Sequence, residues 1–441
     1  MAKSTHGKWK FIKGAITIAS GGFIAKLIGA LYRIPLTNII GGKGIGLYQL
    51  VYPVYCLLLT VSATGIPSPV AKLTAEQVKD GYSGKAVLKS AMKLFLIIGL
   101  IGTVLMCVSA PALSKLQQSR EVIFGYYALA PSVLLVSAIS VFRGYFQGKN
   151  RMSPTALSEI TEQIVKVGLG LFFAYRFKAN IQKAVGYLLL AVSLSEAVAL
   201  LLMWLIYIAN KGDKKTKDGG RVAMKRIIKL SLPVTLSALL LPLSSLVDSV
   251  LAVRLLGVYA TDAITLYGLF SGGAITVINL PVSVCYGIAA ASVPAVAGAK
   301  DTKSVKKRWK FSLAVTLAVS IPATVGLYLF ASPVAKIIFK NLQTGEMNTL
   351  IELIKTLSLS ALFLSCTQTL SACLTAQGKP QLSALSMLVA VTVKTGAYTL
   401  LLKNPKISVF GLAHATNLCY FVAFSLNLLY NIRVSKKAKE R

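Results

Sequence analysis

The residues of this sequence that could do chemistry are ionisable side chains set inside long apolar runs. Lys26 and Arg33 occur seven positions apart in the first run, so in a helix both project from nearly the same face. Ionisable groups at membrane depth are costly to bury and are functional candidates. The two residues predict either a cationic stripe that faces a polar cavity, or side chains that extend to the membrane–water interface.

A second group of ionisable residues, Glu159, Glu162 and Lys166, occurs in the fifth apolar run at spacings of three and four. In a helix these residues share one face, and Glu162 precedes Lys166 in the order that favours an ion pair. The group predicts either a self-neutralising pair that packs the helix into a bundle, or charges that face a cavity and bind an ion or an anionic ligand.

Lys394 belongs to a tripeptide that resembles an earlier one, because Lys394-Thr395-Gly396 matches Lys166-Val167-Gly168. With a two-residue gap, the two glutamates correspond to Met387 and Ala390, so Lys394 has no carboxylate in its own run. It needs either a carboxylate from another helix or an anionic ligand. We expect it to face a cavity.

Three further charged residues belong to the sixth and seventh apolar runs. Asp248 lies within the seventh run and Arg254 lies at its end. Asp248 predicts either a group that binds a proton or a cation, or a partner for a nearby base. Glu196, in the sixth run, has the same two interpretations.

Enzymatic chemistry has no motif in this sequence. There is no P-loop, no GxSxG and no HExxH. The sequence has 2 histidines and 6 cysteines, and the cysteines lie in apolar runs without zinc-ligand spacing, as small buried hydrophobic residues do. We therefore expect a protein that is not an enzyme and that uses no cofactor and no metal.

The composition indicates which elements must position these residues. Of the 441 residues, 55% are hydrophobic and 14% are charged, against about 25% charged in a soluble domain. Apolar runs of about 20 residues recur, and each is long enough to cross a bilayer. The net charge of +34 is spread through short loops, which is typical of membrane topology and excludes a nucleic-acid partner. We predict an all-α polytopic membrane protein in contact with membrane lipids.

About twelve transmembrane helices are predicted from the apolar runs. The first six cover residues 11–32, 47–66, 88–110, 122–142, 155–175 and 184–209, and the second six cover residues 227–253, 264–293, 311–331, 350–376, 382–402 and 409–430. Alternate loops are rich in lysine and arginine, and the loops between them carry far fewer. This positive-inside bias predicts that both termini are cytoplasmic.

An internal repeat organises these helices into two halves. Gln147-Gly148-Lys149 recurs as Gln377-Gly378-Lys379, on either side of a basic polar segment. We predict an N-terminal six-helix lobe at residues 1–210, a basic cytoplasmic linker at 211–226, a C-terminal six-helix lobe at 227–432 and a basic cytoplasmic tail at 433–441. Because each half has an even number of spans, the repeats are parallel and leave a central cavity between them.

Several short stretches resemble the stage V sporulation protein B family, which belongs to the multidrug/oligosaccharidyl-lipid/polysaccharide exporter superfamily. The stretches are Tyr32-Arg33-Ile34-Pro35-Leu36, Gly44-x-Gly46-Leu47-Tyr48-Gln49, Gly65-Ile66-Pro67, Arg143-Gly144-Tyr145-Phe146-Gln147-Gly148, Leu241–Arg254 and Asn279-Leu280-Pro281. The resemblance implies a two-lobed bundle in the bacterial cytoplasmic membrane, with a cavity that opens alternately to either side. It also implies that the substrate is a saccharide linked to a polyprenyl pyrophosphate. Many members have fourteen spans, two more than are predicted here.

The resemblance gives the candidate residues their expected roles. A pyrophosphate is anionic, so the basic group is expected to bind substrate in the cavity, and it consists of Lys26, Arg33, Lys166, Lys394 and Arg254. The acidic group is expected to couple movement to an ion or to form charge pairs, and it consists of Glu159, Glu162 and Asp248.

The sequence is also compatible with two other functions. One is a cation-coupled multidrug antiporter of the same superfamily, for which a proton or a monovalent cation is the partner of the acidic group. The other is a scaffold that does not transport, which short loops disfavour because they leave little surface for a soluble partner.

Overall fold

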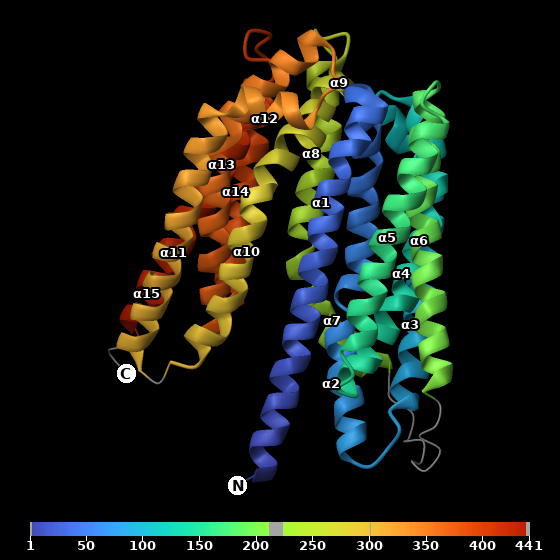
Figure 1. Cartoon of the computed structure of the whole chain (residues 1–441), viewed down its shortest axis with the longest axis vertical. Helices are drawn as coiled ribbons and strands as arrows, with labels where there is room; N and C mark the ends of the chain where they lie inside the picture. The colour runs from blue at the N-terminus through green and yellow to red at the C-terminus, as the bar shows by residue number, and fades with distance from the viewer. Residues whose placement is uncertain (1, 211–223, 300, 438–441) are drawn as a thin grey trace. The chain divides into compact units, whose positions relative to one another are not determined.

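The structure is a computed structural model that describes residues 2–210, 224–299 and 301–437. Within these residues the chain forms helices and turns, and no strand (Figure 1). Nine helical stretches in this part of the chain are long and apolar enough to cross a membrane. The predicted class, an all-α polytopic membrane protein, is confirmed. Most of the predicted linker, and residues 438–441 of the predicted tail, lie outside the described residues.

The chain divides into two compact units. Unit 1 comprises the described residues of Met1–Tyr32 and Leu50–Leu246, and unit 2 those of Arg33–Gln49 and Val247–Arg441. These bounds differ from the predicted lobes at Arg33–Gln49 and at residues 227–246. The lobes were defined by an internal repeat rather than by packing, and they stay a prediction.

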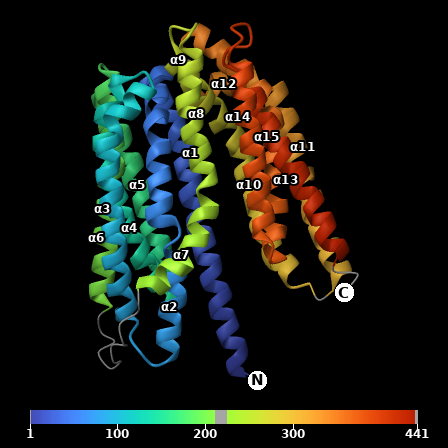
Figure 2. The same cartoon turned by 180° about the vertical axis from the view of Figure 1, so that it is seen from behind.

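Unit 1 is a bundle of long helices. It contains α1 (Ala2–Leu59) apart from Arg33–Gln49, the π-helical segment η1 (Thr60–Thr64), α2 (Pro67–Lys79), α3 (Lys85–Leu116), the short turn η2 (Arg120–Val122), α4 (Ile123–Gly148), α5 (Ser153–Arg176), α6 (Ile181–Ala209), α7 (Met224–Ala238) and the first part of α8 (Leu240–Leu256). Helix α4 packs against α2, α3 and α6, and α5 packs against α6 (Figures 1 and 2).

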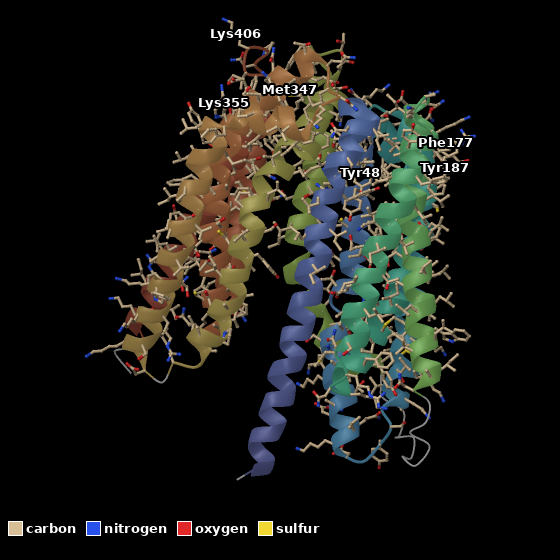
Figure 3. All side chains as sticks on the ribbon, viewed as in Figure 1. Tyr48, Phe177, Tyr187, Met347, Lys355 and Lys406 are labelled. Carbon is tan, nitrogen blue, oxygen red and sulfur yellow. The ribbon has the colours of Figure 1, made fainter. Side chains whose placement is uncertain are left out.

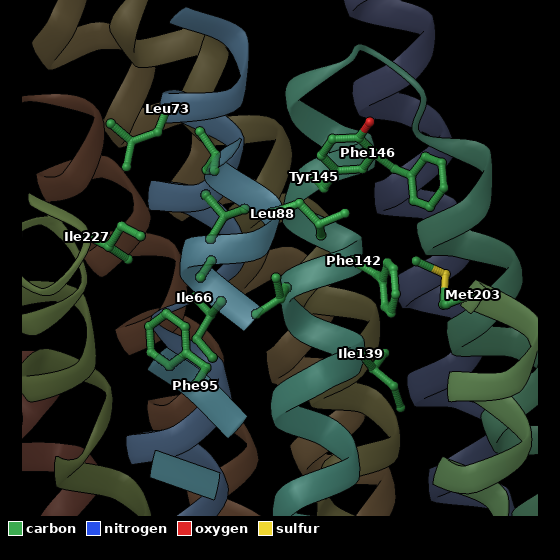
Figure 4. Packing of buried hydrophobic residues seen from close by; sticks show 14 of the residues in the cluster. Ile66, Leu73, Leu88, Phe95, Ile139, Phe142, Tyr145, Phe146, Met203 and Ile227 are labelled. Atoms are coloured by element: carbon green, nitrogen blue, oxygen red, sulfur yellow. The ribbon is translucent and has the colours of Figure 1, made fainter. Parts of the chain in front are cut away.

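The core of unit 1 lies around α4. Phe142 and Phe146 of α4, Leu88 and Phe95 of α3, and Leu73 of α2 belong to one buried cluster (Figure 4). The close approach of α2 to α4 depends on Gly144 of α4, because a residue without a side chain lets the two backbones meet. A Cβ atom on Gly144 would lie 2.8 Å from the carbonyl oxygen of Pro67. Small residues of this kind allow membrane helices to pack backbone to backbone.

Unit 2 is a second bundle. It contains residues Arg33–Gln49 of α1, the rest of α8, α9 (Ala263–Gly268), the π-helical segment η3 (Leu269–Ala274), α10 (Ile275–Ala297), α11 (Thr302–Leu329), α12 (Ala331–Ile338), α13 (Thr344–Ala376), α14 (Pro380–Leu401) and α15 (Phe410–Lys437). Helix α13 packs against α10, α11 and α15 (Figure 2). Polar bonds link α13 to α15: Asn417 Nδ2 donates to the Thr356 carbonyl at 2.7 Å, and Gln377 Nε2 donates to Asn431 Oδ1 at 2.9 Å.

Two predicted boundaries differ from the structure. The predicted loop between the first two spans is largely helical, and α1 is interrupted there only at Gly41, which has φ 69°. The predicted span 227–253 is two helices, α7 and α8, that meet at Leu239. Pro242 has no N–H to donate to the Ala238 carbonyl, so the α-helical hydrogen-bond ladder is broken at that point.

Candidate functional site

Unit 1 contains a cavity of about 350 Å³ that is lined by charged side chains from several helices. Arg143 of α4, the three residues Glu159, Glu162 and Lys166 of α5, and Glu196 of α6 all line it. The shared face predicted for the α5 group is confirmed in one respect, because all three of its members line one cavity. The cavity therefore combines both signs of charge in a part of the chain that is otherwise apolar.

Helices α4 and α5 form a hairpin that sets these charges opposite one another. Asn150, in the left-handed region with φ 58°, ends α4, and Pro154 stands at the start of α5. At the far end of α5, the rings of Phe177 and Tyr187 stack with their centroids 4.3 Å apart, which ties α5 to α6 (Figure 3). The hairpin places Arg143 beside Ser158 and Glu162, residues one turn apart on α5.

Arg143 of α4 forms an ion pair with Glu162 of α5. Its Nη2 donates to Glu162 Oε2 at 3.0 Å, and its Nε donates to Ser158 Oγ at 2.9 Å. The other carboxylate oxygen of Glu162 accepts a hydrogen bond from Gln163 Nε2 at 3.0 Å. The side chains of Arg143 and Glu162 are 13% and 15% exposed, so the pair is largely shielded from solvent. Glu162 is thus held by α4 across the hairpin.

Sequence reasoning missed Arg143 as a site residue. It follows directly after the predicted span 122–142, so the bounds of that span assign it to a loop. In the structure α4 continues to Gly148, which keeps Arg143 inside the helix. The apolar residues Tyr145 and Phe146 that follow it, both buried, were the available signal that the helix does not end at Phe142.

Glu196 is the most deeply buried carboxyl group of this cavity. It is 3% exposed, and its Oε2 accepts no hydrogen bond from any described residue. The Tyr55 hydroxyl, which also lines the cavity, interacts with the same carboxyl group. A buried carboxyl group with one unsatisfied oxygen is suited to holding a proton or to accepting a donor that arrives with a ligand.

Unit 2 contains a separate buried ion pair between α8 and α14. Lys394 Nζ donates to Asp248 Oδ2 at 2.6 Å, and the two side chains are 9% and 14% exposed. The ammonium group also lies 5.4 Å from the centroid of the Tyr398 ring. Lys394 therefore has the carboxylate that its own helix lacks. This is the pairing with another helix that the sequence left open for both residues.

Two of the remaining predicted residues, Arg33 and Arg254, belong to neither of these groups. Arg33 is half-buried in unit 2, and its carbonyl oxygen accepts a hydrogen bond from Thr37 Oγ1 at 2.8 Å. Arg254 is exposed near the end of α8. The side chain of Lys26 lies outside the described residues. A cavity between the two lobes, and the binding and coupling roles of these residues, stay predictions.

Comparison with known proteins gives these sites their context. The family model for "Polysaccharide biosynthesis protein" matches residues 11–300, and the MatE model matches residues 233–396. Stage V sporulation protein B of Bacillus subtilis (strain 168) is 26% identical over 435 residues, which are 94% of this chain and 81% of that protein. The lipid II flippase MurJ of the same organism is 23% identical over 353 residues, which are 74% of this chain and 65% of that protein.

The fold also matches a solved structure. A multidrug resistance MATE family transporter of the MOP superfamily, in an inward-facing conformation, has a TM-score of 0.78 and 17% identity, and covers 97% of this chain and 99% of that one. The relatives are transporters and flippases rather than enzymes. With a family match that spans more than half of its 441 residues, this multi-pass membrane transporter belongs to the polysaccharide biosynthesis protein family.

Proposed function

We propose that this chain is a flippase that moves a saccharide linked to a polyprenyl pyrophosphate across the bacterial cytoplasmic membrane by alternating access. The substrate is a lipid II-like peptidoglycan precursor or a polysaccharide unit, and both termini are cytoplasmic. The observation that carries this proposal is the match of residues 11–300 to the polysaccharide biosynthesis family. The similarity to the lipid II flippase over 74% of the chain supports the same substrate class.

The charged cavity of unit 1 is an argument for a substrate with a phosphorylated headgroup. Arg143 and Lys166 supply positive charge among its lining residues, and arginine binds phosphate oxygens in a bidentate manner. In the absence of substrate, Glu162 is the ion-pair partner of Arg143. A pyrophosphate would replace Glu162 as the partner of Arg143, so that this guanidinium carries a partner in both the empty and the loaded protein. The buried guanidinium is thereby never left without an anionic partner, which would be costly, during transport.

Movement of the headgroup needs no covalent step. The headgroup crosses within the polar interior while the prenyl tail stays in the bilayer, where its transfer out of lipid would be unfavourable. The predicted binding residues Lys26, Arg33, Lys394 and Arg254 belong to this proposal as further positive groups. The acids Glu159 and Asp248 belong to it as ion-coupling groups or charge partners.

A cation-coupled multidrug antiporter is the second candidate function. The specific observation in its favour is the acidity of the unit 1 cavity, where Glu159, Glu162 and Glu196 outnumber the two basic residues. The unsatisfied Oε2 of Glu196 offers a place for a proton or a cationic drug. The MatE match at residues 233–396 belongs to the same alternative.

Reconstitution tests the proposal through Arg143. We expect the purified protein in liposomes to move a fluorescent polyprenyl-pyrophosphate disaccharide between leaflets. We expect Arg143→Lys to slow this movement by at least about tenfold, because lysine keeps the charge but loses the two-pronged contact with phosphate. The charge-matched control is Lys183→Arg at an exposed position of α6, which should leave the rate unchanged.

Two outcomes would contradict the flippase. One is movement of a lipid without the pyrophosphate at the same rate as the labelled precursor. The other is drug efflux driven by a proton gradient, with no movement of the precursor by the same preparation. The second outcome, combined with loss of efflux in Glu196→Gln, would establish the antiporter instead.

A further inference from the structure

Unit 2 has a groove of about 370 Å³ that belongs to neither charged group described above. It lies between α11 and α15, two helices that pack against each other. One helix contributes Lys306, Trp309, Lys310, Leu313, Ala314 and Leu317, and the other contributes Leu428 and Ile432. The groove therefore has a cationic part and an apolar part.

The order of the residues on α11 separates these two parts. Lys306, Lys310, Leu313 and Leu317 follow one another at spacings of four, three and four, so they form a single stripe along one face of the helix. Eleven residues of helix span about 16 Å. The two lysines stand at the N-terminal end of this stripe, and the leucines, opposite Leu428 of α15, stand at the other.

Trp309 gives the groove a fixed apolar wall. Its side chain is 2% exposed, and its Nε1–H donates to Ser435 Oγ on α15 at 3.0 Å. Because the single polar group of the indole is satisfied by α15, the ring contributes apolar surface to the groove. The wall belongs to a buried cluster with Leu370 and Cys373 of α13, so it is supported from behind.

The two lysines have no acidic partner in the part of the chain that the structure describes. Both are exposed, and neither takes part in an ion pair there. Lys303, Lys307 and Arg308 add further positive charge to the same two turns of α11. The nearby acid, Asp301, instead accepts a hydrogen bond from the backbone N–H of Ser304 at 3.2 Å and caps the helix. Positive charge is unfavourable near a helix N-terminus, and a bound anion would offset it.

We propose that this groove binds an anionic glycerophospholipid. The phosphate of the headgroup contacts Lys306 and Lys310, and one acyl chain lies along Leu313, Leu317 and Leu428 against the Trp309 ring. The positive-inside bias places the start of α11 on the cytoplasmic side, where anionic lipids attract basic residues and where basic pockets between helices bind lipid headgroups. The site is independent of the flippase proposal, since it uses none of the unit 1 cavity.

Quenching of Trp309 fluorescence tests the site directly. The chain has 3 tryptophans, so Trp9→Phe and Trp204→Phe leave Trp309 as the only reporter. The full-length protein is reconstituted in vesicles that contain phosphatidylglycerol or phosphatidylcholine with brominated acyl chains. We expect brominated phosphatidylglycerol to quench Trp309 at a mole fraction at least about tenfold lower than brominated phosphatidylcholine, as two lysine contacts with an anionic lipid predict.

Two variants separate the headgroup contact from the acyl-chain contact. Lys306→Gln with Lys310→Gln should remove the preference for phosphatidylglycerol, whereas Lys336→Gln with Lys340→Gln, two exposed lysines elsewhere in unit 2, should leave it intact. Ala314→Phe fills the apolar part without a change of charge and should reduce quenching by both lipids. Unquenched Trp309 emission that matches the parent protein establishes that each variant is folded.

Three results would overturn the proposal. The first is equal quenching by the two brominated lipids in the parent protein. The second is an unchanged preference in the Lys306→Gln, Lys310→Gln variant. The third is displacement of brominated phosphatidylglycerol by a polyprenyl monophosphate at a lower mole fraction than by unlabelled phosphatidylglycerol, which would assign the groove to a prenyl lipid.

Discussion

Arg143–Glu162 and Lys394–Asp248 are ion pairs whose side chains are at most 15% exposed. A buried pair adds little net stability, because desolvation offsets the attraction of its charges. Removal of one partner is a different matter, since it leaves the other charge buried and unpaired. Each pair is therefore a position where a single substitution has a large effect and a double substitution has a small one.

The Lys394–Asp248 pair makes this expectation measurable. We expect Lys394→Gln alone to destabilise the protein by about 3 kcal/mol, because Asp248 loses the hydrogen bond that it accepts at 2.6 Å. We expect Asp248→Asn combined with Lys394→Gln to recover more than half of that loss. Thermal unfolding in detergent measures both values. Equal destabilisation by the single and the double variant would show that the pair is not the reason for the effect.

Residue spacing in the sequence identified some members of these ion pairs but not their partners. Lys394 was identified as a base without a carboxylate in its own helix, but its partner Asp248 is 146 positions away, and no local pattern encodes such a contact. A pair of Glu162 with Lys166 within α5 was one of two expectations, and the structure adds a partner of Glu162 from another helix, Arg143 of α4. Hydropathy places helices along the chain, and it does not specify which faces of two helices meet.

At the scale of the element, glycines distinguish helix faces that closely approach another helix from helix faces that do not. Gly144 of α4 stands against the backbone of α2, whereas Gly168 of α5 has no atom within 4 Å of the place where a Cβ would lie. The two positions are both inside long helices, so they differ in packing rather than in helix propensity. They form a matched pair for substitution by alanine.

The glycine pair yields opposite expectations. Gly144→Ala should destabilise the protein by about 1–3 kcal/mol, because the new methyl group meets the Pro67 carbonyl at 2.8 Å and α2 must move. Gly168→Ala should be neutral or stabilise by up to about 1 kcal/mol, because alanine is the better helix former. Chemical or thermal denaturation of the purified variants measures the difference. Equal effects at both positions would contradict the close approach of α2 and α4.

Hydropathy predicted the elements better than their ends. Each of the predicted spans is mostly helical, because runs of about 20 apolar residues have few other structures available in a bilayer. The points at which helices are interrupted were harder to predict from the sequence. The bounds of the first two predicted spans left residues 33–46 as a loop, whereas α1 is helical on both sides of Gly41, and the interruption at Leu239 follows from a single missing N–H at Pro242.

At the scale of the whole molecule, the first helix takes part in both units. Its residues Arg33–Gln49 pack in unit 2, while the residues on either side of them belong to unit 1. Gln49 Nε2 donates to the Ser271 carbonyl at 3.0 Å, and Asn38 Nδ2 donates to the Ile338 carbonyl at 2.8 Å. Leu36, Ile45 and Leu47 of this segment are at most 1% exposed. Unit 2 is therefore incomplete without residues from the start of the chain.

Expression in two pieces tests this dependence. We expect a fragment of residues 216–441 to be unstable and aggregated in detergent, because it lacks the segment that covers Ser271 and Ile338. We expect co-expression with residues 1–215 to give a soluble, monodisperse complex. A fragment of residues 216–441 that is monodisperse and helical by itself, in size-exclusion chromatography and circular dichroism, would contradict the expectation.

The shared first helix also bears on how members of this family can recombine. A chimera that joins the first 210 residues of one relative to the remainder of another would place a foreign Arg33–Gln49 segment in the second bundle, with mismatched partners for Gln49 and Asn38. Crossovers that move Arg33–Gln49 together with the C-terminal bundle avoid that mismatch. Substitutions in Arg33–Gln49 and substitutions in the C-terminal bundle should accordingly occur together in relatives, although more than 200 residues of sequence separate Gln49 from Ser271.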